Sequence, residues 1–499
     1  MLFKSLIKRI KEALRGMGLI SNIKSVSELT DLPVDDSFYQ QIEMWKKLYQ
    51  GYYPEWHDVR YTTLDGQKTR RMNSLNMPKV MAQELATLIF NERCELSLSD
   101  EGLDEFIAEV LNHNNFYRRF QHYLEYMFAL GGIVLKPYFD NGKIKIAYVT
   151  ADCMIPISWD NKGIREAIFP NQIRRGRKTY THLEWHVWED GLYVVKNELY
   201  ESENSGELGK RVPLSTLYPD LDEVVPMEGI TRPLFVYISP NTANHLDINS
   251  PLGVPIYAHA MDTVHALDVA FDSFEREFRL GKRRIIVPAS AIRVVPDENG
   301  VMRRYFDAND EVYEAMNIGD MDYNKIVDNT VELRVEEHIS AINALLNMLS
   351  MQVGFSAGTF SFDGQGVKTA TEVVSENSKT FRTKQSHEIV IEEALSDLVE
   401  VIVQLAELYE IYDAPDEWDL RVTFDDSIAE DKTTEVDREI TLVASGLQSK
   451  LRALMKIHGL TEESARELLQ EIQEENKVAT IESVDFFGGT SLDGSSLGQ

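Results

Sequence analysis

Residues 354–373 read GFSAGTFSFDGQGVKTATEV and join two long segments that both show helical periodicity. Up to Lys368 the stretch follows neither a helical nor a strand period, and it contains four glycines and three phenylalanines. A connection of this length without secondary structure is uncommon inside a compact domain and is usually functional or disordered. The stretch therefore predicts a glycine-rich, aromatic loop with a role of its own.

Two amphipathic helices are expected on the N-terminal side of this loop, over residues 256–280 and 334–353. Their apolar residues recur at steps of three and four. The positions are Ala260, Val264, Leu267, Phe271, Phe274 and Phe278 in the first helix, and Val335, Ile339, Ile342, Leu346 and Leu349 in the second. Residues 281–333 lie between the helices and contain strand-like runs on either side of a turn at 296–300. The pattern predicts a small α/β insert carried by a helical pair.

A third long helix is expected on the C-terminal side of the loop. Residues 369–372 (TATE) match a capping box, which predicts that the helix begins there. It continues to about Tyr412 and is apolar on more than one face, as expected for a helix with several neighbours. A lone strand is predicted at 419–424, followed by acidic helices up to about residue 477 and a disordered end.

The N-terminal half predicts helices followed by a sheet. Helices are expected over residues 36–56, 76–91 and 103–130. Residues 133–200 then alternate apolar and polar side chains in short runs separated by turn signals, which predicts an antiparallel meander. Residues 201–229 are expected to form a loop or an elaborated hairpin. The fold class predicted from the whole pattern is α+β, with several structural parts.

Length and charge limit the classes of protein that fit. The chain has 499 residues, too many for one hydrophobic core, which predicts two to four structural units. Its net charge of −30 argues against a protein that grips nucleic acid broadly, because most of its surface repels phosphate. Nearly half of this excess lies between Glu392 and Glu439, where 17 acidic residues face 3 basic ones.

Cysteine content and hydropathy indicate the redox environment of the protein and whether it enters a membrane. Cys94 and Cys153 are the only cysteines, so no disulfide framework is expected, and two free thiols suit a reducing cytoplasm. No apolar run approaches the roughly 18 residues needed to span a bilayer, so stable membrane insertion is not expected. Residues 1–18 form a basic amphipathic pattern. Such a helix can lie on a membrane, or it can dock on the acidic body of the protein or on a partner.

Three patterns suggest chemistry but do not complete a catalytic site. Residues 364–370 (GQGVKTA) resemble the end of a phosphate-binding loop, but Val367 stands where that loop requires glycine. His182, Glu184 and His186 alternate along a strand, where they could meet a metal or, as we expect, share a solvated face opposite Leu183, Trp185 and Val187. Acidic pairs such as Asp425–Asp426 could hold two metals, but no His or Lys is placed nearby to complete a site. The sequence therefore predicts no catalytic residue, cofactor or resident metal.

Basic residues cluster in two places. Residues 174–178 (RRGRK) lie in a turn between predicted strands and are expected to be a solvated loop. The second cluster flanks the insert between the helical pair and consists of Lys282, Arg283, Arg284, Arg303 and Arg304. It is either a solvated face or a contact for DNA phosphates or an acidic partner.

The order of these parts resembles the portal (head-to-tail connector) proteins of tailed double-stranded DNA bacteriophages of the long non-contractile-tail (siphovirus) type. The segments that carry the resemblance are IEMWKKLYQGYYPEWH and KVMAQELATLIFNERCEL near the start, the strand series PISWDNKGIREAIFP…YTHLEWHVWEDGLYVVKNELY, and GFSAGTF…KTATEVVSENSKTFRT. The resemblance covers residues 1 to about 425. It is specific as an ordered set, although no single segment would suffice.

The resemblance implies a division of the chain into named parts. These are a wing (1–255), a first stem helix (256–280), a clip (281–333), a second stem helix (334–353), a tunnel loop (354–369), a long helix and strand that return to the wing (370–426), and a crown with a flexible tail (427–499). It also implies a ring, usually of twelve subunits. Different faces would then contact the left and right neighbours, which would explain a long helix that is apolar on several sides.

The resemblance further implies a conduit for DNA packaging and ejection at one capsid vertex of the virion, assembled in the cytoplasm of the bacterial host. Expected partners are DNA in transit, terminase, a head–tail adaptor, and the major capsid and scaffolding proteins. The tunnel loop would touch DNA without reading its sequence, through Phe355, Gly358, Phe360, Phe362, Gly364, Gly366 and Lys368. Terminase or the adaptor would dock on the clip through Lys282, Arg283, Arg284, Arg303 and Arg304.

Two further expectations concern the loop and the activity. A loop that faces a channel would have no core to bury it, so its glycines would supply reach and mobility. A conduit of this kind is not an enzyme, because a separate terminase motor hydrolyses ATP. The alternative function is a virion-associated, metal-dependent nuclease that uses the acidic clusters.

Overall fold

The computed structural model describes residues 36–63, 66–90, 94–203, 208–281, 285–286, 293–296, 302–305, 327–328, 332–362, 370–415, 417–424, 432–458, 464–466, 468–470 and 472. The chain divides into two compact units. The first comprises residues up to Gly366 together with Lys379–Phe424, and the second comprises Val367–Ser378 and Asp425–Gln499. Both helices and strands are well represented, so the predicted α+β class is confirmed.

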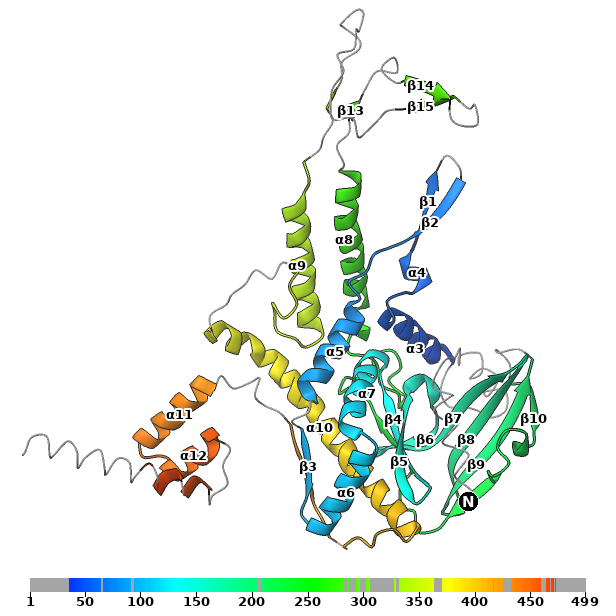
Figure 1. Cartoon of the computed structure of the whole chain (residues 1–499), viewed down its shortest axis with the longest axis vertical. Coiled ribbons are helices and arrows are strands. Elements are labelled where there is room, and N and C mark those ends of the chain that lie inside the picture. The colour runs from blue at the N-terminus through cyan, green and yellow to red at the C-terminus, as the bar shows by residue number, and fades with distance from the viewer. Residues whose placement is uncertain are drawn as a thin grey trace, which may run out of the picture. The chain divides into compact units, whose positions relative to one another are not determined.

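The N-terminal part of the first unit is largely helical (Figure 1). Its helices are α3 (Asp36–Tyr49), the single turn α4 (Pro54–His57), α5 (Met77–Ile89), α6 (Glu101–His113) and α7 (Phe116–Leu130). The first helix ends earlier than predicted, and Pro54 begins α4 instead of following it, because proline is tolerated in a first helical turn. The single helix predicted over 103–130 is two helices, since Asn115 between them has a left-handed backbone (φ 49°).

The strands of this unit form two larger antiparallel sheets, not one meander. One sheet has the order β12-β4-β5, and the other has the order β10-β9-β8-β7-β6, with β11 also paired to β9. The strands are β4 (Ile133–Asp140), β5 (Lys143–Thr150), β6 (Ile155–Asp160), β7 (Gly163–Arg175), β8 (Lys178–Glu189), β9 (Leu192–Ser202), β10 (Lys210–Val212), β11 (Val224–Met227) and β12 (Val236–Ile238). The predicted meander is confirmed for β6 to β9. It also holds for the β4–β5 hairpin, but it is wrong between β5 and β6, which lie in different sheets, and β12 arrives from far along the chain to pair with β4.

Helix α10 (Ala370–Leu408) contributes the residues of its second half, from Ile391 onward, to the hydrophobic core. Its buried side chains lie on several sides of the helix: Ile391, Ala394, Leu395, Leu398, Val399, Val401, Ile402, Val403, Leu405 and Ala406. Contacts within one chain therefore bury these faces, and the expectation that neighbouring subunits explain them is wrong. The strand predicted after this helix, β17 (Leu420–Thr423), is not alone, because it pairs with β3 (Glu95–Leu98).

Helices α8 (Met261–Leu280) and α9 (Val335–Gln352) form an antiparallel pair. Glu277 near the end of α8 binds Arg334 at the start of α9, while His259 before α8 contacts the carbonyl of Gln352 at the end of α9. Between the helices lie β13 (Ile285–Ile286), β14 (Arg293–Pro296), β15 (Met302–Tyr305) and β16 (Val327–Asp328), paired as β13–β16 and β14–β15. A further hairpin, β1 (Asp58–Thr63) with β2 (Gly66–Arg71), stands beside α8 (Figure 1).

The second unit contains α11 (Lys432–Ala444) and α12 (Lys450–His458). Glu439 of α11 is 1% exposed and accepts hydrogen bonds from Lys456 of α12 (3.0 Å) and from Gln448. Across the described parts of the chain, no helix combines the length and apolar character needed to cross a membrane.

Candidate functional site

The helical pair α8–α9 is held by the two apolar seams that the periodicity predicts. Val264, Leu267, Ile342, Leu346 and Leu349 are at most 3% exposed. The seam weakens toward the insert, where Phe278 is 43% exposed. At that end, the hydrogen bonds and charge of Arg334 lower the pKa of Glu277 to about 2. This ion pair closes the helical pair next to the insert.

The first part of the glycine-rich stretch is folded, not free. Phe355 is 1% exposed, and its N–H donates to the carbonyl of Ser350. Gly354 has φ +89°, and its carbonyl accepts a hydrogen bond from the Thr383 hydroxyl (2.8 Å). A Cβ on Gly354 would stand 2.5 Å from that hydroxyl oxygen. Gly354 therefore serves close packing on α10, not mobility, and the expectation that no core would bury this loop is wrong for its beginning.

Two asparagines on α9 hold the rest of the described loop. The Asn347 Oδ1 accepts from the N–H of Gly358 (2.8 Å), and the Asn343 Oδ1 accepts from the N–H of Phe362 (2.8 Å). The ring of Phe362 packs edge-on against Phe274 of α8, with centroids 5.4 Å apart. Residues 354–362 thus double back along α9. Sequence reasoning missed Asn343 and Asn347, although two asparagines four residues apart in an apolar helix are a signal, because asparagine is a poor helix former.

The predicted loop residues have unequal roles in this arrangement. Phe355 is a buried anchor against Phe360 (5.1 Å between centroids), and Phe360 and Phe362 are half-buried. Gly358 is exposed. The remaining predicted loop residues, Gly364, Gly366 and Lys368, lie outside the described residues.

The predicted clip residues are placed only in part. Arg303 and Arg304 lie on β15, where they pair with Val295 and Val294 of β14. Lys282, Arg283 and Arg284 lie outside the described residues. The other basic cluster, residues 174–178, forms the exposed turn between β7 and β8, as predicted.

Two buried carboxylates on α8 hold the base of the β1–β2 hairpin. Asp272 accepts two hydrogen bonds from the guanidinium of Arg70 (2.7 and 2.6 Å) and one from the N–H of Asn73 (3.1 Å). One turn earlier, Asp268 accepts from the N–H of Leu75 (3.1 Å). Burial alone would raise the pKa of Asp272, but the hydrogen bonds from Arg70 lower it below its usual value. The hairpin is therefore fixed to the helical pair at its base.

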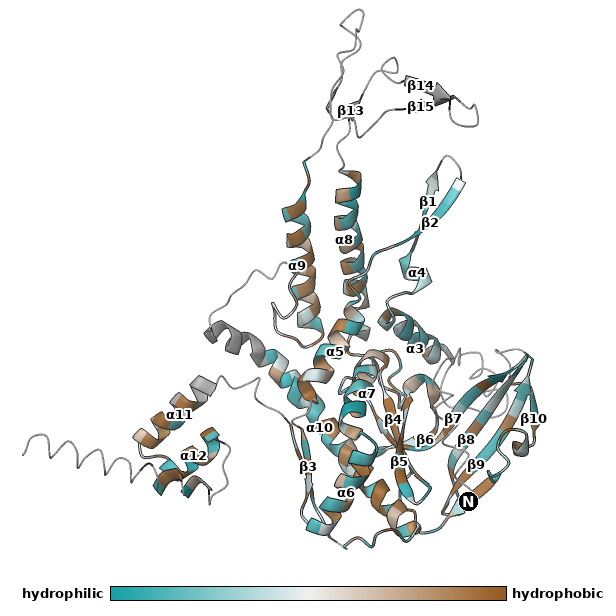
Figure 2. Cartoon of the chain, in the orientation of Figure 1, coloured by the Kyte–Doolittle hydropathy of each residue, from teal (hydrophilic) through white to brown (hydrophobic). Residues whose placement is uncertain are grey.

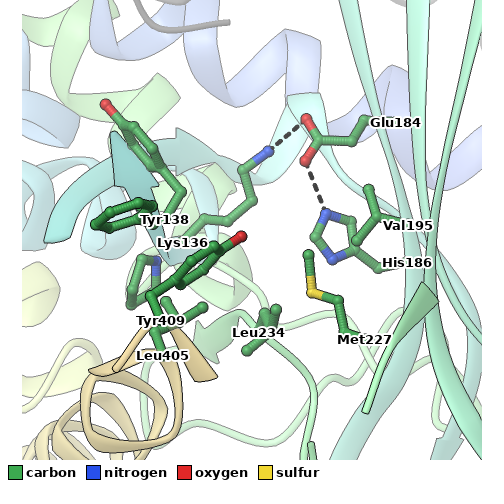
Figure 3. Close-up of a pocket in the computed structure, with 11 residues that line it drawn as sticks. Lys136, Tyr138, Glu184, His186, Val195, Met227, Leu234, Leu405 and Tyr409 are labelled. Carbon is green, nitrogen blue, oxygen red and sulfur yellow. Dashed lines mark hydrogen bonds and ion pairs between the residues drawn. The ribbon is translucent and has the colours of Figure 1, made fainter. Parts of the chain in front are cut away.

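A buried polar network joins the two sheets (Figure 3). The Lys136 ammonium on β4 binds Glu184 on β8 (2.7 Å), and the other oxygen of Glu184 accepts from the Nε2–H of His186 (2.9 Å). The Tyr193 hydroxyl accepts from the N–H of Leu234 and donates to His186 Nδ1 (2.7 Å). The Glu184 carboxylate can only accept a hydrogen bond, so Nε2 carries the proton, and in the neutral ring Nδ1 is left to accept from Tyr193.

The prediction that His182, Glu184 and His186 share a solvated face is wrong. They are 3%, 8% and 3% exposed, respectively. His182 has its own partner, the Asn197 side chain at 3.0 Å. Polar groups can be buried where each finds a partner, and sequence alternation does not show where those partners come from.

Charge partners decide the protonation of this network. Burial raises the pKa of Glu184, but Lys136 and His186 outweigh burial and hold it well below its usual range. Burial lowers the pKa of His186 below its ordinary value, although Glu184 opposes this shift. Glu184 is therefore a carboxylate paired with a lysine ammonium, and His186 is neutral.

A small cavity of about 30 Å³ lies between this network and apolar side chains that include Leu234, Met227 and Leu405 (Figure 3). That volume fits about one or two water molecules and is far below the roughly 300 Å³ of a small-molecule pocket. Among the residues with described positions, no three His, Cys, Asp or Glu side chains gather as metal ligands. The network therefore has the character of a structural joint between the sheets.

Acidification is expected to weaken the fold through His387 on α10. This ring is 4% exposed, accepts a hydrogen bond from the N–H of Asn241 at Nδ1 (3.0 Å), and has its pKa lowered to about 4 by burial. The unfolded chain binds this proton near pH 6.5, so the stabilisation is complete above that pH and is lost toward pH 4. The shift corresponds to at most about 3 kcal/mol.

Chemical unfolding at several pH values would measure this loss. The variant His387→Gln should show a smaller decrease in unfolding free energy between pH 7 and pH 4 than the unaltered protein. Equal decreases would show that His387 does not carry the dependence.

The described residues thus form an α+β protein with two larger sheets, a helical pair that carries an insert, and a loop folded back on that pair. The chain matches the family described as phage portal protein, SPP1 Gp6-like, over residues 31–478. Because this match covers most of the chain, the protein belongs to that family of phage portal proteins. The expected siphovirus type is consistent with it. No match was found among curated proteins.

Proposed function

We propose that this chain assembles into a ring of about twelve copies at one vertex of the capsid, where it forms the channel for DNA packaging and ejection. The family match over residues 31–478 carries this proposal. The antiparallel pair α8–α9 would be the stem, residues 281–333 the clip, and residues 354–369 the tunnel loop. The strongly negative charge supports a channel through which DNA slides, because acidic surfaces repel phosphate.

The assembly state tests the proposal directly. Mass measurement and negative-stain images of the purified full chain should show closed rings with a central opening. A monomer that degrades plasmid DNA in the presence of divalent cations would instead support the alternative, a metal-dependent nuclease. The acidic pair Asp425–Asp426 considered for that alternative lies outside the described residues.

The tunnel loop is proposed to act after assembly. Deleting residues 363–365, which follow the anchored part of the loop, should leave rings intact and remove most DNA-filled heads. The reason is that residues 354–362 are held by α9 and α10, so the deletion spares the fold of the subunit. Replacing Asp363 and Gln365 by alanine keeps the length and leaves Gly364 in place, so it is the matched control. Normal filled heads from the deletion variant would contradict the role of the loop.

The clip is proposed to bind terminase and the head–tail adaptor through its basic residues. The double variant Arg283→Ala, Arg284→Ala should keep the ring and reduce packaging by weakening this docking or a contact with DNA. Arg174→Ala with Arg175→Ala, in the exposed β7–β8 turn, is the control. If both variants package DNA equally well, Arg283 and Arg284 are not part of the docking surface.

A further inference from the structure

The small sheet formed by β3 and β17 has one face on the core. Leu96 and Leu98 of β3 and Leu420 and Val422 of β17 are half-buried against the core, whereas the residues that alternate with them are exposed. Apolar and polar residues accordingly alternate along β3 (Figure 2). The two strands pair antiparallel, with Leu98 opposite Leu420 and Leu96 opposite Val422. The inner face therefore fixes the sheet, and any further contact is made through its outer face or its edges.

The hydrogen bonds of this sheet show which backbone groups point outward. The Ser99 N–H donates to the carbonyl of Asp419 (3.0 Å), so these two residues form a hydrogen-bonded pair at the end of the ladder. Hydrogen-bonded and non-hydrogen-bonded pairs alternate along an antiparallel ladder. The two apolar pairs are therefore non-hydrogen-bonded, and their N–H and C=O groups point to the outer edges of the sheet.

The outer edge of β3 is covered by its own chain. The Leu98 N–H donates to Oδ1 of Asp104 on α6 (2.7 Å). The backbone of Leu96 hydrogen-bonds to the Tyr117 hydroxyl on α7. Covering a strand edge in this way keeps it from pairing with another chain.

The outer edge of β17 has no such cover. Within the described parts of the chain, no hydrogen bond reaches the outward N–H and C=O groups of Leu420 and Val422. The edge thus offers two donors and two acceptors at the spacing of a strand. An open edge of this kind is a template for an added strand, which is a recurring mode of peptide recognition.

A groove of about 870 Å³ lies beside the start of β17. One wall is a face of α10 that includes Glu400, Val403 and Gln404, and the other is the segment 417–420, which leads into β17. The volume lies within the range of about 300–1,000 Å³ that binding sites occupy. A segment that adds to the open edge therefore has room to continue into the groove.

The groove and the strand beside it are acidic. Residues 407–423 contain six acidic residues and one basic residue. Arg232 binds Glu400 on the α10 wall, whereas Glu417 and Asp419 on the other wall are exposed and have no ion pair with a described residue. The charge selects a basic partner, because like charges that face each other across an interface are costly.

We propose that the open edge of β17 and the adjacent groove bind an extended, basic segment of a partner protein, which adds to the β3–β17 sheet as a third strand. The backbone of the segment pairs with Leu420 and Val422. Its apolar side chains continue the inner face of the sheet, and its lysine or arginine side chains face Glu417 and Asp419. The inference does not depend on the proposed ring, because all of these groups lie in one chain.

A single backbone N–H tests the added strand. The probe is a short fluorescent peptide of alternating valine and lysine, and its binding to the full chain is measured by fluorescence anisotropy. Val422→Pro removes one outward N–H, which proline tolerates at a strand edge, and should raise the dissociation constant about tenfold or more. Val422→Ala keeps this N–H and also shortens the side chain, so it is the matched control and should bind the peptide as the unaltered chain does.

A modified peptide makes the same test without a variant of the protein. N-methyl groups on alternate residues keep the charge and the side chains, but they remove the N–H groups that donate to the carbonyls of Leu420 and Val422. This peptide should bind the unaltered chain about tenfold more weakly or less. Equal binding of both peptides, or equal binding by Val422→Pro and Val422→Ala, would reduce the interaction to a general attraction of lysine to an acidic protein and overturn the added strand.

Charge reversal tests the acidic wall. Glu417→Lys with Asp419→Lys should weaken peptide binding about tenfold or more. Glu84→Lys with Asp220→Lys changes the net charge by the same amount at exposed positions outside the groove, and should have little effect. Thermal unfolding of both double variants should match that of the unaltered chain. If the two double variants weaken binding equally, the acidic wall does not select the partner, and the proposal of a basic segment is wrong.

The state of assembly distinguishes an outside partner from a neighbouring copy. Rings and unassembled copies should bind the peptide equally. Binding by unassembled copies alone would show that a neighbouring copy covers the edge in the ring, and an outside partner would be excluded. If the chain forms no ring, the proposed function fails while the binding of the peptide is unaffected.

Discussion

Replacing Lys136 by methionine is expected to lower the free energy of unfolding by about 3–5 kcal/mol. Lys136 and Glu184 are 5% and 8% exposed, and the ammonium is the charge partner that keeps Glu184 ionised in the core. Methionine keeps most of the apolar volume of the lysine side chain but leaves the Glu184 carboxylate without its counter-charge. Urea unfolding at pH 7, followed by circular dichroism, would measure the difference.

An exposed ion pair provides the matched control. Lys178 binds Glu201 at 2.5 Å on the surface of the same sheet, where water screens both charges, so Lys178→Met should leave the free energy of unfolding almost unchanged. The double variant Lys136→Met, Glu184→Gln should recover part of the loss, because the amide oxygen still accepts from His186 without carrying a charge. If Lys136→Met and Lys178→Met lower the free energy of unfolding by similar amounts, water reaches Glu184 and solvates its charge in place of Lys136.

Replacing Gly131 by alanine is expected to destabilise the protein by about 2–5 kcal/mol. Gly131 ends α7 with φ +90°, and a Cβ there would stand 2.5 Å from the carbonyl oxygen of Gly253. The conflict is with backbone, which cannot rotate away as a side chain can. The segment around Gly253 leads into α8, so the substitution should also disturb the position of the helical pair.

The destabilisation by Gly131→Ala has two causes, the strain of a positive φ and the clash with the Gly253 carbonyl, and a substitution at Gly142 separates them. It has φ +79°, but a Cβ there would meet nothing within 4 Å. Gly142→Ala should therefore cost only the backbone strain, about 1–2 kcal/mol. If Gly131→Ala costs no more than Gly142→Ala in urea unfolding, the close approach of the two backbones is not essential to the fold.

Local patterns predicted much of the fold because they reflect backbone geometry over a few residues. The seams of α8 and α9 appeared as steps of three and four. Toward the core their residues are buried as predicted, whereas toward the insert Phe271, Phe274, Val335 and Ile339 are half-buried and Phe278 is exposed. Turn residues also predicted the hairpins between strands, since Asn141 and Gly142 both adopt positive φ in the β4–β5 turn. These features need no distant partner to be recognised.

The candidate site was predicted less completely, because its hydrogen bonds join residues that are distant in the sequence. The sequence marked residues 354–369 as unusual, but it did not show that Asn343, Asn347 and Thr383 hold the first part of the loop against α9 and α10. Each of these bonds joins residues at least eleven positions apart. No short-range pattern specifies such a bond, because its donor and acceptor become neighbours only after the helices pack.

The sequence by itself determined the α+β class, the seams of α8 and α9, the strongly acidic character and the membership that the ordered segments implied. Only the tertiary structure decided that both faces of β8 are buried from Thr179 to Glu184, that β12 and β17 pair with distant strands, and that α10 is buried on several sides from Ile391 to Ala406. The difference is energetic. A charged residue such as Glu184 is costly to bury when it is alone and tolerable when it is paired, and the lysine that pairs with it lies 48 residues away.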